Sequence, residues 1–558
     1  MDNFQKLFEP GRIGKMDINN RILMSPMGNQ LWKDGFVTDR LKDYFEARAK
    51  GGVGMVMTDP LKVTWPVGAG HKDTGLIVDD KFILGLSELV QVIHQQGVKI
   101  AAQLGHMGPA DAFPVTETLL QPVAASTIGE PPDYTHPASS IVRYSLPREM
   151  SVGEIVDVVA AFAKGAERVQ KAGFDAIEIN AHTRYLINSF LSPAWNRRKD
   201  EYGGDLRNRA RFLLEIVSTI KEAVGHDYPL LCRINGEERN IIGGITIEMA
   251  KEFALMLENA GVDAIDVSGM WPHIPSDPPG FNVNAASAIK KVVSIPVLVS
   301  GRLSPELGER LLRHKKADFI VIGRPLIADP ELPNKAASGR LDDITPCLYC
   351  DSCLALDRDC AVNAARGRER EYEIKPAEKT KKVLVVGGGP GGMEAARVAA
   401  LRGHQVVLYE KENKLGGQLI LASILRKENE ALIKYLTTQM RKLGVKVELG
   451  KEVAPALIAE IKPDAIVLAT GATSSLPEIP GINRDNVLSG ADIQEMMHSR
   501  LRRDGRNKRG SRRRVIWYLG CILMRAPFGQ SVMRQLLRFW TPFGKRVVVV
   551  GGGGATWY

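Results

Sequence analysis

The stretch Lys382-Val-Leu-Val-Val-Gly387-Gly388-Gly389-Pro390-Gly391-Gly392 opens a second domain in this chain of 558 residues. The aliphatic run predicts a buried strand, and the glycines after it have the spacing Gly-x-Gly-x-x-Gly. Gly387 allows a tight turn, Gly389 lets a pyrophosphate approach the backbone, and Gly392 lets the next helix pack on the strand. Because a helix N-terminus also favours phosphate, the stretch predicts a Rossmann-like, dinucleotide-binding domain.

The residues that follow strengthen this interpretation. A second predicted strand, Gln405–Tyr409, ends in Glu410, an acid suited to hold ribose hydroxyls. Leu415–Leu419 and Asp464–Ala472 resemble two flavin-contacting segments of the two-dinucleotide flavoprotein reductases. That resemblance implies bound FAD, with four more contacting residues: Gly417, Gln418, Thr470 and Gly471.

The part before this domain contains eight short aliphatic runs, most of them followed by a segment of helical length. Phe212–Val224 is one such amphipathic segment. Eight buried strands alternating with helices predict a TIM (β/α)8 barrel, so the fold class is α/β. Ala110–Pro147 predicts a long loop over the barrel mouth. The predicted strands are Arg21–Met24, Gly54–Thr58, Lys99–Leu104, Ala176–Ile179, Leu230–Ile234, Ala264–Val267, Pro296–Val299 and Phe319–Ile322.

The barrel also carries a family pattern. Phe190–Arg198, then Asp200–Gly204 and Asn208–Arg209, resemble the signature of the Old Yellow Enzyme family. Within that family the chain is most similar to the branch of 2,4-dienoyl-CoA reductase and the clostridial 2-enoate reductases. The resemblance covers roughly residues 5–495, and it implies FMN, a [4Fe–4S] cluster and FAD as cofactors.

The resemblance places the FMN at the carboxyl ends of the barrel strands. It implies that Gln103 bonds the pyrimidine end of the flavin and that Arg233 lies near N1 and O2. A fixed guanidinium there stabilises the negative charge of the reduced flavin. The other implied FMN contacts are Pro26, Met27 and Gly28 at the isoalloxazine edge, and Ser300, Gly301, Arg302, Gly323 and Arg324 at the phosphate, where barrels usually bind it.

Two residues are candidates for catalysis. Tyr185 aligns with the tyrosine proton donor of the family, and His273 resembles the histidine that assists it in the dienoyl-CoA branch. Reduction of an activated alkene needs a hydride at one carbon and a proton at its neighbour. Many family members bind the substrate carbonyl with a His and a His or Asn, but Asn180 and Thr183 stand in those places. This departure favours an enoate or acyl-CoA over a simple enone and leaves His182 as an open candidate.

Four of the six cysteines are crowded into one short segment: Cys347, Cys350, Cys353 and Cys360. Thiolates at this density suit tetrahedral zinc or a [4Fe–4S] cluster, and the spacing alone leaves both open. The family resemblance favours the cluster, although the gaps between the cysteines are shorter than the family's. Cys232 and Cys521 stand alone and are interpreted as packing residues.

The composition is that of an ordinary globular protein, with 44% hydrophobic and 25% charged residues. Most of the net charge of +10 comes from Arg500–Arg514, where nine basic residues accompany one acid. We interpret that run as a solvated connector and expect no nucleic-acid partner. The sequence contains neither a signal peptide nor an apolar run long enough for a membrane span, so we expect a cytoplasmic protein. A homo-oligomer is compatible with these features.

The sequence predicts five segments along the chain. They are an FMN barrel (1–340), an iron–sulfur segment (341–366), a linker (367–380), an FAD domain (381–498), and a basic connector with the start of an NAD(P)H domain (499–558). The run Val547–Gly551 begins a second nucleotide motif that Tyr558 cuts off. We therefore expect a truncated version of a longer enzyme, with weak FAD content.

These parts predict an NAD(P)H-dependent ene-reductase that acts on a small unsaturated carbonyl, carboxylate or acyl-CoA compound. Electrons would pass from NAD(P)H to FAD, then through the cluster to FMN. An amine dehydrogenase of the trimethylamine dehydrogenase type is one alternative, but such proteins attach FMN to a cysteine after the first strand, and this chain has none before Cys232. A non-catalytic electron-transfer fragment is the other alternative.

Overall fold

The computed structural model describes residues 4–110, 120–128, 146–269, 277–354, 359–472 and 479–482, with single residues at 484, 487 and 535. The chain divides into two compact units. The first comprises Met1–Cys347 and Asp351–Tyr372, and the second comprises Leu348–Cys350 and Glu373–Tyr558. The five segment boundaries expected from the sequence remain predictions.

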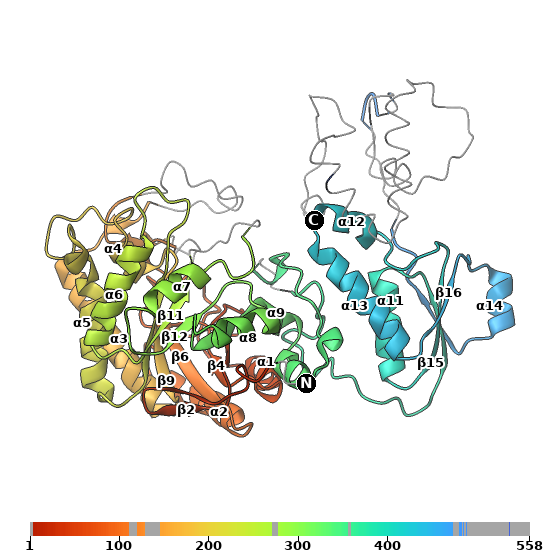
Figure 1. Ribbon diagram of the computed structural model, residues 1–558, viewed down its shortest axis with the longest axis horizontal. Coiled ribbons are helices and arrows are strands. Elements are labelled where there is room, and N and C mark those ends of the chain that lie inside the picture. Colours follow the sequence, from red (N-terminus) through yellow and green to blue (C-terminus); the bar gives the residue numbers. More distant parts are fainter. Residues whose placement is uncertain are drawn as a thin grey trace. The chain divides into compact units, whose positions relative to one another are not determined.

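The first unit is a closed barrel of eight parallel strands (Figure 1). The strands pair around the ring in the order β4-β3-β13-β12-β11-β10-β9-β6, and β4 pairs with β6 to close it. Each strand overlaps one of the eight predicted runs, so the predicted barrel is confirmed. The strands are β3 (Ile22–Met24), β4 (Met55–Met57), β6 (Lys99–Gly105), β9 (Ala176–Ala181), β10 (Leu230–Asn235), β11 (Ala264–Ser268), β12 (Val297–Val299) and β13 (Phe319–Ile322).

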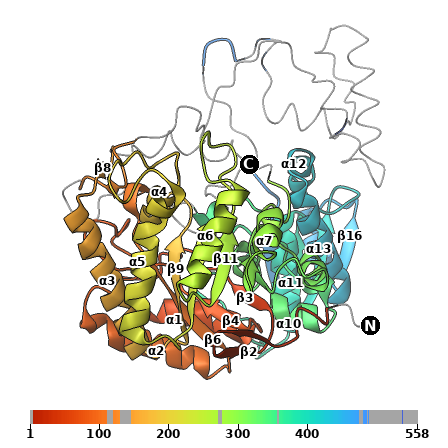
Figure 2. The same ribbon diagram turned by 60° about the vertical axis from the view of Figure 1, so that its left-hand side comes forward.

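Helices surround the barrel, and Figure 2 shows α3, α5 and α6 next to one another on its outer side. Their apolar faces pack on the strands, and several have side-chain caps; Ser151 and Glu154 form a capping box on α3. The helices are α1 (Asp39–Lys50), α2 (Ile83–His94), α3 (Val152–Lys171), α4 (Leu186–Leu191), α5 (Leu206–Val224), α6 (Ile247–Asn259), α7 (Val283–Ile289), α8 (Pro305–Arg313), α9 (Arg324–Ala328) and α10 (Leu332–Ala337).

A hairpin that the sequence did not predict closes the amino end of the barrel. Its strands, β1 (Gly11–Ile13) and β2 (Met16–Ile18), are antiparallel. Ile13, Met16 and Ile18 are buried in one cluster with inward-facing side chains of the barrel strands, among them Ala176 and Ala264 at the amino ends of β9 and β11. This cluster forms an apolar floor, so the polar chemistry of the barrel lies at the opposite, carboxyl end.

An aspartate immediately before a strand recurs as a link between neighbouring strands. Asp263, before β11, accepts a hydrogen bond at 2.9 Å from the backbone N–H of Leu230, the first residue of β10. The same arrangement joins β9 to β6 and β13 to β12 and, in the second unit, β17 (Ala465–Leu468) to β14 (Lys382–Val386). In each case the carboxylate satisfies a backbone donor near the start of the neighbouring strand. The equivalent aspartates are Asp175, Asp318 and Asp464.

The second unit contains a four-stranded parallel sheet in the order β16-β15-β14-β17. Figure 1 shows α11 and α13 on one face of this sheet and α14 on the other. This is the predicted Rossmann-like arrangement, with the glycine-rich turn between β14 and α11. The elements are β14 (Lys382–Val386), α11 (Pro390–Leu401), β15 (Gln405–Glu410), α12 (Leu419–Leu425), α13 (Glu428–Lys442), β16 (Lys446–Leu449), α14 (Pro455–Ile461) and β17 (Ala465–Leu468).

Short elements complete the first unit. β5 pairs with β6, and β7, which lies within the predicted loop over the barrel mouth, pairs with β8, which directly follows that loop. In the part of the chain that the structure describes, no helix has the length and apolarity needed to span a membrane. These elements are β5 (Leu61–Lys62), β7 (Val123–Ala124), β8 (Arg148–Glu149) and the 3-10 turns Asp80–Phe82, Gly108–Ala110, Leu341–Asp343 and Ser352–Leu354.

Candidate active site

Arg233 lies near the carboxyl end of β10, with its guanidinium inside the barrel. Its Nη1 donates to Ser25 Oγ and its Nη2 donates to Ser268 Oγ, both at 3.1 Å. Nη1 also lies 3.1 Å from a carboxylate oxygen of Asp266. The Nε atom is buried without a hydrogen-bond partner in this structure. Arg233 is thus fixed on one side by strands β3 and β11, with donor capacity left for a ligand.

Gln103 lies on β6, toward its carboxyl end. Its Nε2 donates to Glu178 at 2.5 Å, and its Oε1 accepts from Asn180 Nδ2 at 3.1 Å. Asn180 Oδ1 and Thr58 Oγ1 are buried without hydrogen-bond partners. In folded proteins, buried polar atoms seldom lack a hydrogen-bond partner. Unpaired donors and acceptors at the carboxyl ends of β4, β9 and β10 fit the pyrimidine edge of a flavin, which offers both.

The predicted segment after β3 contacts the predicted phosphate region. The backbone N–H of Ser25 donates to Ile322 O at 2.9 Å. A side chain at Gly323 would come within 2.6 Å of the Met27 sulfur, so the two segments lie in close contact here. Pro26, Met27 and Gly28 therefore follow a strand that is directly paired to β13.

The two Gly-Arg pairs follow the adjacent strands β12 and β13. Gly301 has a φ of +127° and Arg302 a φ of +50°, so the backbone turns sharply after Ser300. The Arg302 guanidinium donates to Asp277 O at 2.5 Å, and the Arg324 guanidinium forms an ion pair with Asp351. Their expected contact with phosphate remains a prediction, which the adjacency of the two turns supports.

Tyr185 is the N-cap residue of α4, directly after a turn in which Thr183 has a φ of +58°. Asn235 holds that turn: its Oδ1 accepts from the Thr183 N–H at 2.8 Å, and its Nδ2 donates to Thr183 O at 3.1 Å. Nδ2 also donates to the buried carboxylate of Glu238 at 3.1 Å. Burial raises the pKa of Glu238. Two residues on and after β10 therefore set the position of a tyrosine that follows β9.

His182 is the residue that the structure brings next to Tyr185. The two rings meet edge to face, with centroids 5.6 Å apart. Thr183 Oγ1 and His182 Nδ1 are 2.8 Å apart, so a hydrogen bond orients the imidazole. Both rings are half-buried and so are partly open to solvent. The predicted partner of the tyrosine, His273, lies outside the described residues.

Other buried groups in the barrel were not predicted from the sequence. His106, after β6, is buried, and burial followed by the nearby Lys62 charge lowers its pKa to about 3, so its imidazole is neutral. Glu178 and Asp266 point into the barrel from β9 and β11. A signal for these two acids exists, because the strands read Ala-Ile-Glu178-Ile and Ala-Ile-Asp266-Val, each with an acid in an aliphatic run.

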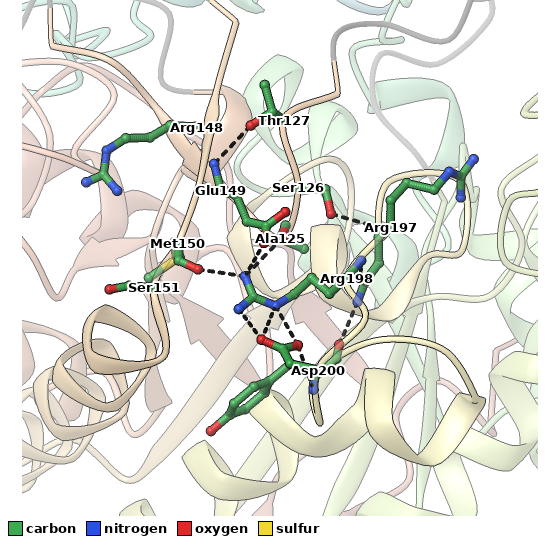
Figure 3. A network of polar contacts seen from close by, with 12 residues as sticks. Ala125, Ser126, Thr127, Arg148, Glu149, Met150, Ser151, Arg197, Arg198 and Asp200 are labelled. Atoms are coloured by element: carbon green, nitrogen blue, oxygen red, sulfur yellow. Dashed lines mark hydrogen bonds and ion pairs between the residues drawn. The ribbon is translucent and has the colours of Figure 1, made fainter.

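The family signature after α4 has a structural role, shown in Figure 3. The Arg198 guanidinium donates to Met150 O at 2.6 Å and to Ala125 O at 3.2 Å, and it pairs with Asp200 at 2.5 Å. Ala125 follows β7 and Met150 follows β8. The buried side chain of Arg198 therefore connects the β7–β8 pair of the mouth loop to the segment after α4, which leads into α5.

The glycine-rich turn of the second unit has the close contacts that its sequence predicts. Gly387 has a φ of +108°, and a side chain at Gly392 would lie 1.9 Å from Gly387 O. A side chain at Gly389 would meet nothing within 4 Å, which leaves open space for a phosphate at the start of α11. Glu410 accepts from the Gly388 N–H at 2.7 Å and so supports the turn; its ribose contact remains a prediction.

The other predicted FAD segments meet at this turn. A side chain at Gly417 would lie 3.0 Å from the Gly389 Cα, so the segment with Gln418 packs against the turn. Gln418 Nε2 donates to Ala472 O at 3.4 Å, which brings the Thr470-Gly471 segment to the same place. These residues fit FAD.

The cysteine segment follows the barrel. Within the described residues, no group of three or more His, Cys, Asp or Glu side chains is arranged to hold a metal ion. Residues 355–358, between Cys353 and Cys360, lie outside the described part. Beyond Cys360, Asn363 donates to Ile327 O at 2.7 Å and Arg366 donates to Asn29 O at 2.8 Å. The segment is thus attached to α9 and to the loop after β3.

The fold and these two sites define a flavin oxidoreductase with a barrel domain and a nucleotide-binding domain. Residues 6–343 match the model of the NADH:flavin oxidoreductase / NADH oxidase family, and residues 381–555 match that of the pyridine nucleotide-disulphide oxidoreductases. The chain belongs to the NADH:flavin oxidoreductase / NADH oxidase family, within the Old Yellow Enzyme and 2-enoate reductase branch. FMN, FAD and NAD(P)H are the cofactors that these two matches imply.

Several relatives match most of the chain. It is 42% identical to an NADH oxidase of Thermoanaerobacter brockii over 507 residues, which are 87% of this chain and 76% of the relative. It is 35% identical to a cinnamate reductase of Clostridium sporogenes over 531 residues, 88% of this chain and 77% of the relative. A 2-naphthoyl-CoA reductase solved with 2-naphthoyl-CoA is 33% identical and has a TM-score of 0.81, covering 88% of this chain and 78% of that one.

Proposed function

We propose that this protein reduces the C=C bond of an enoate or an unsaturated acyl-CoA, with Tyr185 as the proton donor. The observation that carries the proposal is the half-buried Tyr185–His182 pair at the mouth of a barrel whose interior fits a flavin. The names of the cinnamate reductase and 2-naphthoyl-CoA reductase relatives support the same substrate class. Bound FMN, once reduced, supplies the hydride.

The residues of the chain supply the rest of the reaction. Arg233 places a fixed positive charge where the pyrimidine end of the flavin would carry negative charge after reduction. Gln103 and Asn180 orient that end through their amide groups. Tyr185 delivers its phenolic proton to the carbon beside the one that receives hydride. His182, edge to face with the phenol ring, is placed to help return a proton from solvent.

The experiment is anaerobic reoxidation of the dithionite-reduced protein by cinnamate or a dienoyl-CoA. We expect the flavin to reoxidise with formation of the saturated product. Tyr185→Phe should slow reoxidation about 10²- to 10⁴-fold, the usual contribution of a general acid, while FMN content stays unchanged. Tyr228→Phe, far from the mouth and bonded to Phe174 O, is the matched control. Indifference to every activated alkene would favour a non-catalytic electron-transfer role.

The amine dehydrogenase alternative receives less support. The residues after β3 are Ser25, Pro26, Met27 and Gly28, so no cysteine is present there to attach FMN. A test with secondary and tertiary amines in the same anaerobic assay separates the two: an amine substrate would reduce the oxidised flavin, whereas an alkene oxidises the reduced flavin.

We further propose that Cys347, Cys350, Cys353 and Cys360 ligate a [4Fe–4S] cluster. Two observations support this proposal. The four cysteines lie within 14 residues, and the segment that follows them is bonded to Asn29, directly after the predicted FMN segment Pro26–Gly28. Iron and acid-labile sulfide assays test it: Cys350→Ser should lose both, and Cys232→Ser should retain both.

A further inference from the structure

The candidate site contains two acids that the proposed reaction leaves without a role. Glu178 lies on β9 and Asp266 on β11, and β10, with Arg233, runs between them. Both acids are 0% exposed. Their neighbours two residues earlier, Ala176 and Ala264, belong to the apolar floor, and alternate residues of a strand share one face. Glu178 and Asp266 therefore both point into the barrel, one layer above the floor.

The surroundings of the pair contain little that could compensate two negative charges. β6 contributes the uncharged Gln103, and β12 and β13 contribute the apolar Leu298 and Val321. β10 contributes Arg233 as a cation, while the preceding residue, Cys232, points to the opposite face of the strand. Burial, and then the charge of the two acids, raises the pKa of Cys232, so it remains an uncharged thiol.

The hydrogen bonds of the two carboxyl groups are incomplete. Glu178 Oε2 accepts from Gln103, whereas Glu178 Oε1 and both oxygens of Asp266 accept no hydrogen bond. Asp266 lies 3.1 Å from the Arg233 guanidinium in an ion pair. Two ionised carboxylates beside one guanidinium would leave a net negative charge in an apolar barrel, which is costly. One added proton makes the group of three neutral and supplies a missing donor.

The electrostatics agree with this geometry. Burial, and then the negative charge of Asp266, raises the pKa of Glu178 to about 8. Burial also raises the pKa of Asp266, while the Arg233 charge opposes that rise. The two carboxyl groups titrate as a pair, so the proton belongs to the pair and not to one residue.

We propose that Glu178 and Asp266 share one proton behind Arg233 and act as positioning residues that set the charge presented to the flavin. The proposal rests on the assignment of Arg233 to the flavin pyrimidine edge made above. With the proton present, one carboxylate balances the guanidinium. Without it, the group becomes net negative and opposes the negative charge of the reduced flavin. When FMN is reduced at high pH, the Glu178–Asp266 pair therefore takes up one proton from solvent, in addition to the proton that the flavin itself takes up.

The first experiment is infrared spectroscopy of the purified protein, which needs no turnover. A protonated buried carboxyl group should give a carbonyl band at pH 7 that disappears as the pH rises above about 8. Glu178→Gln should remove the band. Glu309→Gln changes a buried carboxylate on α8, outside the barrel interior, and should leave the band unchanged. Absence of the band in the native protein at pH 7 would overturn the proposal, even if the protein reduces alkenes.

The second experiment is the pH dependence of the FMN midpoint potential. Above about pH 8, the FMN midpoint potential of the native protein should fall by about 30 mV more per pH unit than it would without the pair. For a two-electron couple, this is one extra tenfold change per pH unit in the equilibrium constant of reduction. Glu178→Gln and Asp266→Asn each leave a single carboxyl that can pair with Arg233, so this extra dependence should vanish. Glu309→Gln should keep it. An identical slope in native protein and both pair variants would overturn the proposal, whereas loss of alkene reduction alone would count against the proposed function.

Discussion

Tyr185 owes its position to residues that are distant in sequence. The left-handed turn at Thr183 is uncommon for a β-branched residue, and Asn235 holds it with two hydrogen bonds. Glu238 in turn holds Asn235 and accepts from Asn188 on α4 at 2.7 Å. The phenol is thus fixed from outside its own loop, as precise proton delivery requires.

At the residue scale, the buried Glu178 predicts a pH dependence of stability. Its pKa in the folded protein is about 8 against an ordinary value of 4.5, so the folded state binds a proton that the unfolded state releases between these pH values. The free energy of unfolding should therefore fall as the pH rises from about 4.5 to 8. Urea denaturation of native protein and Glu178→Gln across this range measures the contribution, and the variant should show a smaller fall. If the free energy of unfolding fell equally with pH in the native protein and in Glu178→Gln, the predicted contribution of Glu178 would be contradicted.

At the scale of elements, the aspartates before β9, β11, β13 and β17 explain how short strands keep their register. Each carboxylate binds a backbone N–H near the start of the neighbouring strand. Three of them also hold a lysine: Asp175 binds Lys99, Asp263 binds Lys221, and Asp318 binds Lys290. Strands of three to seven residues have few ladder hydrogen bonds, so each such link is a large part of the pairing.

Asp263 provides the test of this link. Asp263→Ala should leave the buried Lys221 ammonium without its carboxylate and destabilise the protein by about 3–5 kcal/mol. Asp227→Ala removes an ion pair with Lys15 in which both side chains are mostly exposed, at 77% and 69%, and should have no measurable effect. Thermal or urea unfolding monitored by circular dichroism measures both variants. Equal unfolding midpoints would show that the link does not stabilise the barrel.

The elements also show which parts of the fold the sequence could predict. All eight barrel strands were predicted, because buried parallel strands are continuous runs of β-branched and other aliphatic residues. The β1–β2 hairpin and the β7–β8 pair were missed, because strands of two or three residues have too few positions for a pattern. The signature around Arg198 was recognised as a family feature, but its role in fastening the mouth loop depends on contacts with Ala125 and Met150.

At the scale of the whole molecule, the chain combines two units, each with its own fingerprint and its own core. The barrel site is built by polar residues at strand ends, and the second site by glycines that let segments approach closely. The predicted FMN residues that the structure describes all lie in the first unit, and the predicted FAD residues all lie in the second, so the two flavins should be separable by mutation.

Gly392→Ala tests this separation. The added methyl group would lie 1.9 Å from Gly387 O, so the turn should be disrupted and FAD lost, while FMN remains bound. Dithionite-driven alkene reduction should persist, whereas any NAD(P)H-driven reduction should be abolished. Gly391→Ala, where the methyl group meets nothing within 4 Å, is the matched control. Flavin extraction and chromatography give the FMN and FAD contents, and loss of FMN in Gly392→Ala would contradict independent sites.

The sequence by itself determined the barrel and the Rossmann-like domain, and it supplied the residues predicted for both flavin sites. The barrel and the glycine-rich turn follow from local patterns, because strand burial and glycine spacing have direct physical causes, whereas the FMN residues were predicted from the family resemblance. The tertiary structure decided the rest. It placed His182 beside Tyr185, assigned Arg198 to the mouth loop, and brought Glu178 and Asp266 to either side of Arg233. These relations depend on which strands become neighbours when the barrel closes, and no local pattern carries that information.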